Sequence, residues 1–182
     1  MSHALKIVPP HYTYDDYKLW EGRWELIKGI AHSMLPTPSV IHQTVSNHIA
    51  WVLGSQLDKC PTCTALLPVD WRIDEDTVVQ PDNLVVCHPV AGAYLTRAPV
   101  LIFEVLSKST ALKDQNTKFS LYEREGVKYY VIVNAEDRCA KIFVLHEGCY
   151  IKLCDVGNES VDFDLGKCSI HFDFSLIWPQ ED

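Results

Sequence analysis

One stretch of the chain combines a continuous apolar run with a carboxylate inside it. Residues 100–106 read Val-Leu-Ile-Phe-Glu-Val-Leu, and residues 84–87 form a second, shorter run of apolar side chains. Runs that are apolar throughout, rather than alternating, are typical of central strands covered on both faces. Glu104 is therefore predicted to lie in a low-dielectric region, where an ionised carboxylate requires a cation or a metal close by.

Asp82 is the second candidate carboxylate. It follows Pro81, whose fixed φ and missing N–H suit the entrance of a strand. We therefore expect Asp82 at the end of the sheet that Glu104 reaches from a neighbouring strand. Two converging carboxylates favour a magnesium site, because magnesium takes oxygen ligands and commonly accepts one or two carboxylates together with water and phosphate.

These residues resemble a known group, the putative restriction endonuclease family within the PD-(D/E)XK nuclease superfamily. The resemblance covers residues 12–144 and lies in the combination of several short motifs. In chain order the similar motifs are Trp24-Glu25-Leu26-Ile27-x-Gly29, Met34-x-Pro36, His42, Pro81-Asp82, Glu104-Val105-Leu106-Ser107, Asp114-x3-Lys118-x3-Tyr122, and Gly126-Val127 before Tyr129 to Val133.

The resemblance implies a fold, an activity and a ligand set. The fold is an α/β domain with a restriction-endonuclease-like mixed β-sheet flanked by helices, a single nuclease domain over residues 1–182. The activity is magnesium-dependent endonuclease cleavage of a phosphodiester, with manganese as a substitute metal. Asp82, Glu104 and the backbone carbonyl of Val105 would hold the metal, and Glu25 would be a further catalytic carboxylate.

The sequence departs from the superfamily motif at one position. The motif has lysine two residues after Glu104, where this chain has Leu106. The family's usual answer is a lysine on the next helix, which here is Lys118. Lys108 is nearer in sequence, but it lies where the strand is expected to end. Tyr122, one helical turn after Lys118, would contact the phosphate or hold the lysine, whereas an exposed, salt-bridged helix face is the structural alternative.

Two further residues have open alternatives from the sequence alone. Glu25 lies in a predicted hairpin over residues 23–34, either as a site carboxylate or as a solvent-facing strand residue. His42 begins the apolar stripe of a helix predicted over residues 39–58, so it should face the sheet. There it is either a satisfied core histidine or a partner of a site carboxylate or a phosphate.

The net charge opposes strong nonspecific binding of nucleic acid. The formal charge is −8, and phosphate contacts by lysine and arginine supply most nonspecific affinity. A local basic strip is the counter-argument, and its expected members are Lys108, Lys113, Lys118, Arg124 and Lys128. A catalytically silent binding module and a hydrolase of small phosphoesters therefore stay open beside the nuclease. The expected partner is nucleic acid, with DNA favoured over RNA, and a homodimer is left open.

Composition also sets expectations for the compartment. No stretch of eighteen apolar residues exists, and residues 1–10 have no apolar segment with a cleavage site, so we expect a cytoplasmic protein without a membrane span. The seven cysteines are scattered, several of them in apolar runs, which favours reduced thiols that pack as small hydrophobes. Cys60-Pro61-Thr62-Cys63 is a lone C-x-x-C without a second pair, so a loop with incidental cysteines is preferred over a zinc or redox site.

Periodicity and turn residues predict the remaining elements. A short helix is expected within residues 12–20, and a second helix begins at Ser109 or Thr110 and ends at Glu125. The predicted strands cover residues 65–73, 128–134, 139–145, 150–154 and 169–172.

Overall fold

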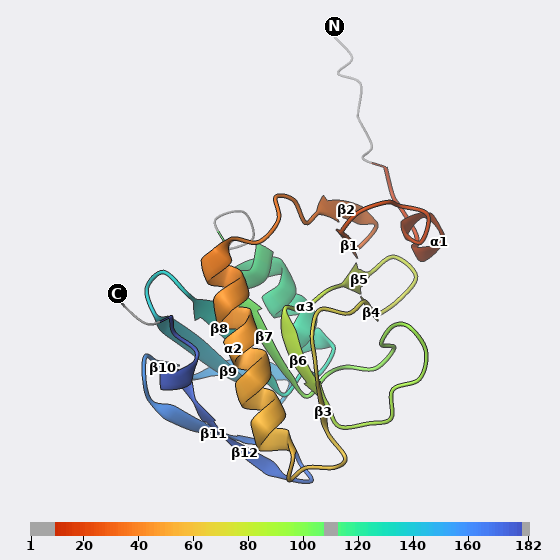
Figure 1. Ribbon diagram of the computed structural model, residues 1–182. Coiled ribbons are helices and arrows are strands. Elements are labelled where there is room, and N and C mark those ends of the chain that lie inside the picture. The colour runs from red at the N-terminus through yellow and green to blue at the C-terminus, as the bar shows by residue number, and fades with distance from the viewer. Residues whose placement is uncertain (1–9, 108–112, 180–182) are drawn as a thin grey trace, which may run out of the picture.

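A six-stranded mixed sheet forms the centre of the molecule, in the order β10-β9-β8-β7-β6-β3 (Figure 1). The computed structural model describes residues 10–107 and 113–179. The strands of this sheet are β3 (Thr64–Leu66), β6 (Asn83–Val86), β7 (Leu101–Val105), β8 (Tyr129–Asn134), β9 (Cys139–His146) and β10 (Cys149–Val156). β7 and β8 pair in parallel, and the other neighbouring strands pair antiparallel. The connection from β7 to β8 is therefore a crossover, as the sequence predicted.

Two smaller sheets and several helices surround the central sheet. The strands of a four-stranded sheet, ordered β2-β1-β5-β4, are β1 (Trp24–Ile27), β2 (Ile30–Ser33), β4 (Trp71–Arg72) and β5 (Val78–Val79). A separate hairpin consists of β11 (Ser160–Asp164) and β12 (Ser169–Asp173). The helices are α1 (Tyr14–Tyr17), α2 (Val40–Leu57), the π-helix η1 (Lys113–Lys118), α3 (Phe119–Arg124) and the 3₁₀ helix η2 (Phe174–Leu176). Across residues 10–107 and 113–179, no helix is long and apolar enough to cross a membrane.

Apolar side chains cover both faces of β7. Leu101, Phe103 and Val105 belong to one core cluster, which α2 and the β11–β12 hairpin complete. Ile102 belongs to the second cluster, which lies against α3 and the four-stranded sheet. Because successive side chains of a strand alternate between faces, Glu104 points to the side of Ile102. Glu104 is 2% exposed, which confirms the prediction that this carboxylate is buried in a central strand.

A buried asparagine docks α2 on β6. Asn83 is fully buried, and its Oδ1 accepts a hydrogen bond of 2.9 Å from Ser46 Oγ on α2. Its Nδ2 donates to the main-chain oxygen of Ser46 over 3.1 Å. His42 lies one helical turn before Ser46, and Asp82 directly precedes Asn83, so this contact sets the distance between those two residues as well.

The structure confirms several predicted elements. The short N-terminal helix forms as α1 with a capping box between Thr13 and Asp16. The hairpin over residues 23–34 forms as β1 and β2, and the long helix forms as α2 with Ser39 as its N-cap. The predicted helix start at Ser109 or Thr110 lies outside the described residues. The described part of this helix consists of η1 followed by α3, which ends at Arg124.

One predicted strand is wrong. Residues 65–73 were expected to form a single strand, but β3 ends at Leu66 and β4 begins at Trp71. The two halves belong to different sheets, because β3 pairs with β6 whereas β4 pairs with β5. Pro68 lies between them and cannot donate a ladder hydrogen bond, which accounts for the interruption.

The expectation of reduced thiols is wrong for four of the seven cysteines in this structure. Cys60 is disulfide-bonded to Cys168, and Cys63 is bonded to Cys87. The free cysteines among the described residues are Cys139, Cys149 and Cys154. The lone C-x-x-C motif therefore has a second pair of cysteines, Cys87 and Cys168, which are distant in the sequence but lie beside it in the folded chain.

We predict that Asn83→Ala destabilises the protein by about 1–3 kcal/mol, because the substitution leaves the Ser46 hydroxyl without its buried acceptor. Urea unfolding followed by circular dichroism measures the change. Asn158→Ala, at an exposed position, is the matched control and should change the free energy of unfolding by less than about 0.5 kcal/mol. Equal stability of Asn83→Ala and the wild type would contradict the docking role.

Candidate active site

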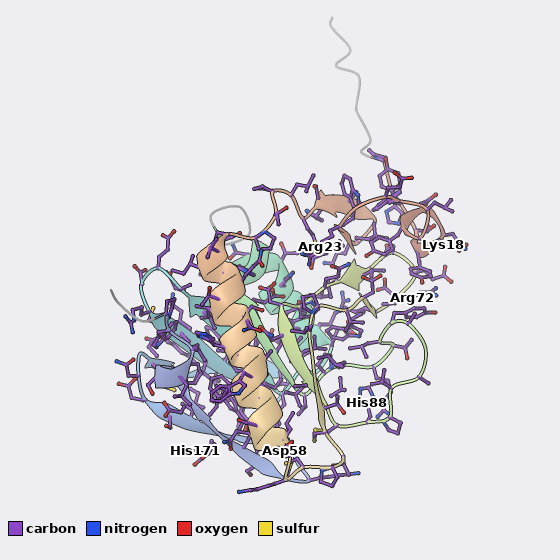
Figure 2. All side chains as sticks on the ribbon, in the orientation of Figure 1. Lys18, Arg23, Asp58, Arg72, His88 and His171 are labelled. Atoms are coloured by element: carbon purple, nitrogen blue, oxygen red, sulfur yellow. A yellow bond between two sulfur atoms is a disulfide. The ribbon has the colours of Figure 1, made fainter. Side chains whose placement is uncertain are left out.

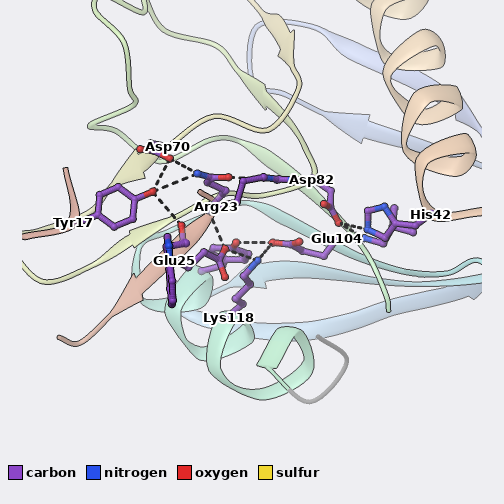
Figure 3. Close-up of polar contacts among 12 residues, drawn as sticks. Tyr17, Arg23, Glu25, His42, Asp70, Asp82, Glu104 and Lys118 are labelled. Carbon is purple, nitrogen blue, oxygen red and sulfur yellow. Dashed lines mark hydrogen bonds and ion pairs between the residues drawn. The ribbon is translucent and has the colours of Figure 1, made fainter. Parts of the chain in front are cut away.

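Lys118 lies between two carboxylates that come from different sheets. Its Nζ is 2.9 Å from Oε1 of Glu25 on β1 and 2.8 Å from Oε1 of Glu104 on β7 (Figure 3). The side chains of Glu25, Glu104 and Lys118 are 0%, 3% and 3% exposed. We refer to these three residues as the Glu25–Lys118–Glu104 triad. Lys118 is the last residue of the π-helix η1, a rare conformation that is frequent at functional sites.

Tyr122 holds the Glu104 end of the triad. Its hydroxyl donates a hydrogen bond of 2.7 Å to Glu104 Oε1, the oxygen that also meets Lys118. Burial, reinforced by the charge of Glu104, raises the pKa of Tyr122 well above its ordinary value of 10.0, so the hydroxyl stays protonated as a donor. The sequence suggested that Tyr122 would contact the phosphate or hold the lysine, but the structure shows it on the carboxylate.

Asp82 lies at the other side of Glu104. Its Oδ2 accepts a hydrogen bond of 2.9 Å from the backbone N–H of Val105 and is 3.2 Å from Nε2 of His42. The side chain of Asp82 is 14% exposed, so it is more accessible than the triad. Of the alternatives for His42, the structure therefore shows the contact with a site carboxylate. Asp82 directly precedes β6, and Glu104 lies near the end of β7. Because these strands pair antiparallel, both residues lie at the same end of the sheet, as the sequence predicted.

Sequence reasoning missed Gln80, Asp70 and Arg23 beside the site. The backbone N–H of Gln80 donates a hydrogen bond of 3.0 Å to Oε1 of Glu25. The side-chain Nε2 of Gln80 donates to Asp70 over 2.6 Å, and Asp70 also accepts from the hydroxyl of Tyr17. Arg23 is exposed, and its guanidinium lies 3.4 Å from Oε1 of Gln80 (Figure 3). The sequence carries no signal for the contact of Gln80 with Glu25, because a backbone N–H makes it.

Two members of the basic strip expected near the site, Arg124 and Lys128, form ion pairs with acidic side chains. Arg124 pairs with Glu125 over 2.7 Å. Lys128 pairs with Asp164 over 2.8 Å. Lys128 precedes the start of β8, which runs parallel to β7, so it lies at the end of these strands opposite to Val105. Lys108 and the side chain of Lys113 lie outside the described part of the chain.

The donor chemistry of the site fits magnesium. Carboxylate oxygens of Asp82 and Glu104, with the carbonyl of Val105, are the hard ligands that this ion takes. The carboxylates of Glu25 and Glu104 contact the ammonium of Lys118, and Asp82 lies beside them on the backbone N–H of Val105. Among these four groups, when ionised, three negative charges stand against one positive charge. Two negative charges remain, which is the charge that one divalent cation neutralises. Within residues 10–107 and 113–179, no three His, Cys, Asp or Glu side chains are already gathered around one point as metal ligands.

A comparison to protein families identifies the group to which the chain belongs. Residues 14–163 match the Uma2 family, described as "Putative restriction endonuclease". This chain belongs to the Uma2 family. The matched region contains every residue of the candidate site, from Glu25 to Tyr122.

A solved structure shows that the fold is shared by another protein of this kind. The Uma2-family chain superimposes with a TM-score of 0.76 on the crystal structure of a putative nuclease belonging to DUF820 from Anabaena variabilis. The two chains are 16% identical, and the match covers 92% of this chain and 97% of the other. The restriction-endonuclease-like α/β fold is thereby confirmed. No curated protein matches the sequence.

We predict that Lys118→Met destabilises the Uma2-family chain by about 3–5 kcal/mol, because it leaves two buried carboxylates without their cation. Denaturant unfolding at neutral pH measures the loss. Lys118→Met combined with Glu25→Gln should recover part of it, since the double variant buries one negative charge fewer. A double variant as unstable as the sum of its single changes would show that Lys118 and Glu25 do not interact.

Tyr122→Phe should change the pH dependence of stability in alkali. The folded-state pKa of Tyr122 is raised, so its contribution is complete below pH 10 and is lost as pH rises from 10 towards the folded pKa. The wild type should therefore lose up to about 1.4 kcal/mol more per pH unit above pH 10 than Tyr122→Phe does. Urea unfolding between pH 8 and pH 11 measures both slopes. Parallel slopes would contradict a buried, protonated Tyr122.

Proposed function

We propose that this chain is a metal-dependent endonuclease that hydrolyses phosphodiester bonds of nucleic acid, with DNA as the favoured substrate. The observation that carries the proposal is the Glu25–Lys118–Glu104 triad beside Asp82. An ammonium held by two buried carboxylates, next to a third and more accessible carboxylate, is an arrangement suited to binding a cation and a phosphate together.

Magnesium would be held by Asp82, Glu104 and the carbonyl of Val105, with manganese as a substitute. When bound, it would lower the pKa of a coordinated water and stabilise the negative charge that develops on the phosphate. The charge of four described groups supports this assignment, because the carboxylates of Asp82, Glu104 and Glu25 exceed the ammonium of Lys118 by two charges. Glu25 would add negative charge without direct access to the substrate, since its side chain is fully buried.

The other residues of the site would hold these groups in place. Lys118 would keep its ammonium charged through its contacts with two carboxylates and direct it at the attacking water. Tyr122 fixes the orientation of Glu104, and His42 fixes that of Asp82. The phosphate would approach from the side of Asp82, because this carboxylate is more exposed than the triad.

A cleavage assay tests the proposed activity. Wild-type protein is incubated with supercoiled plasmid, single-stranded DNA, RNA and a small aryl phosphate, each with Mg²⁺, Mn²⁺ or a chelator. Metal-dependent nicking or cutting of the polymers without turnover of the aryl phosphate is the expected result. Turnover of the small phosphoester alone would favour the phosphoester hydrolase. Binding without cleavage of any substrate would favour the catalytically silent module.

We predict that Lys118→Ala lowers metal-dependent cleavage by about 10²-fold or more, the scale for losing one preorganised electrostatic contact. Lys108→Ala should have much less effect. Because Lys118→Ala also destabilises the fold, Tyr150→Phe serves as a second control. It removes a partly buried hydroxyl that donates to the carbonyl of Val127, away from the site. Initial rates are compared at a temperature where circular dichroism shows all variants folded. Wild-type rates in folded Lys118→Ala would remove the lysine from the mechanism.

Arg23→Ala should weaken substrate binding with little effect on stability. The exposed guanidinium of Arg23 lies beside Gln80, close to the accessible side of the site, where it would meet a substrate phosphate. Fluorescence anisotropy with labelled DNA in Ca²⁺, at several salt concentrations, should show a lower affinity and a salt slope smaller by about one unit. Arg97→Ala, also exposed, is the matched control. An equal loss in both variants would assign the effect to general charge.

A further inference from the structure

Four cysteines from three separate segments meet at the C-terminal end of α2. Cys60 and Cys63 lie in the turn between α2 and β3, Cys87 follows β6, and Cys168 precedes β12. Figure 2 labels Asp58 and His88, which lie two residues before Cys60 and directly after Cys87. We refer to Cys60, Cys63, Cys87 and Cys168 as the four-cysteine cluster.

The two disulfides of the cluster lie against each other. Cys60 is bonded to Cys168 and Cys63 to Cys87, and Sγ of Cys63 is 4.0 Å from Sγ of Cys168. All four sulfurs are thus connected by bonds or by this contact. Zinc binds four thiolates in a tetrahedron with Zn–S distances of about 2.3 Å, which places the sulfurs about 3.8 Å apart. The contact between the two disulfides is close to that spacing.

The local chain has the form of a zinc-binding turn. Cys60-Pro61-Thr62-Cys63 has the two-residue spacing that places two thiolates on one zinc ion. The backbone N–H of Cys63 donates to the carbonyl of Cys60 over 2.9 Å, which closes the turn. The other two ligands would come from Cys87 and Cys168, so the second pair is assembled by the fold.

The surroundings of the cluster favour a closed structural site with one route to solvent. Cys60 and Cys63 are 2% and 7% exposed and belong to the core cluster beneath α2, against which Cys87 and Cys168 also pack. Cys87 lines an open cavity of about 410 Å³ together with Lys167. A small reductant can therefore approach the Cys63–Cys87 disulfide from this cavity. Lys59 and Lys167 flank Cys60 and Cys168 in sequence, and their positive charge opposes the net −2 charge of a zinc ion with four thiolates.

This cluster is separate from the candidate active site. β6 lies between them, with Asp82 directly before its first residue and Cys87 directly after its last. Five residues of extended strand span about 16 Å. A metal held by four protein ligands would also leave no open position for a substrate, unlike the proposed magnesium site.

We propose that the reduced protein binds one Zn²⁺ through the thiolates of Cys60, Cys63, Cys87 and Cys168, and that the two disulfides are the oxidised form of the same site. Two molecules of a dithiol reductant supply four electrons and four protons, so both S–S bonds break, four thiols form, and each reductant closes its own disulfide. Zinc then displaces four thiol protons as four Zn–S bonds form. The oxidised form offers no thiolate and therefore does not bind the ion. This agrees with the absence of a ready-made set of metal ligands in the described part of the chain, where all four sulfurs are in disulfides.

Metal analysis of the full chain tests this inference. Protein reduced with a phosphine, exposed to Zn²⁺ and freed of unbound metal by gel filtration should retain about one zinc per chain. Cys87→Ser and Cys168→Ser should each retain much less, whereas Cys149→Ser, which changes an exposed free cysteine, should match the wild type. Oxidation with diamide should release the bound zinc. A folded, reduced wild type without zinc would overturn the proposal, and so would full zinc content in both cluster variants.

Cobalt substitution decides the case in which the cluster variants do not fold. The reduced wild type titrated with Co²⁺ should develop the intense thiolate-to-cobalt charge-transfer bands and the tetrahedral d–d bands of a four-sulfur site, saturating at one equivalent. Weak octahedral bands, or none, would contradict it. Neither readout depends on DNA cleavage, so failure here and failure of the proposed endonuclease activity can be told apart.

Discussion

The buried ammonium of Lys118 is the interaction on which the arrangement of the two larger sheets depends. Glu25 belongs to the four-stranded sheet, Glu104 to the central sheet, and Lys118 to the crossover between β7 and β8. Each of these charges alone would be costly in the interior, and their mutual contacts, together with the hydrogen bonds from Tyr122 and Gln80, offset the loss of hydration. The small sheet therefore has an electrostatic as well as an apolar reason to pack on the same face of the central sheet as α3.

Part of this arrangement could be predicted because it follows from local periodicity. The apolar run around Glu104 indicated a strand covered on both faces, and the helical stripe that begins at His42 placed this side chain towards the sheet. The pairing of Lys118 with Glu104 was different, because fourteen residues separate them and only a family resemblance connected them. Gln80 could not be identified, because it reaches Glu25 through a backbone N–H that nearly any residue other than proline would supply.

The errors arose where long-range contacts override local pattern. Residues 65–73 are apolar enough for one strand, yet the two halves pair with different partners on either side of Pro68. The C-x-x-C motif lacked a second pair in sequence because Cys168 is 108 positions from Cys60. The π-helix that ends at Lys118 was also missed, since a helix with wider turns has no distinct pattern of apolar residues.

The triad also links the proposed chemistry to the completion of folding. Its members come from three segments that meet only when the N-terminal hairpin, the central strand and the crossover have all docked. In a chain that lacks any one of these contacts, the remaining charges are hydrated and dispersed, and no dry, preorganised centre exists. With the proposed function, a nascent chain, or a molecule opened locally at β1, would be inert, and cleavage of nucleic acid would be confined to molecules that have completed folding.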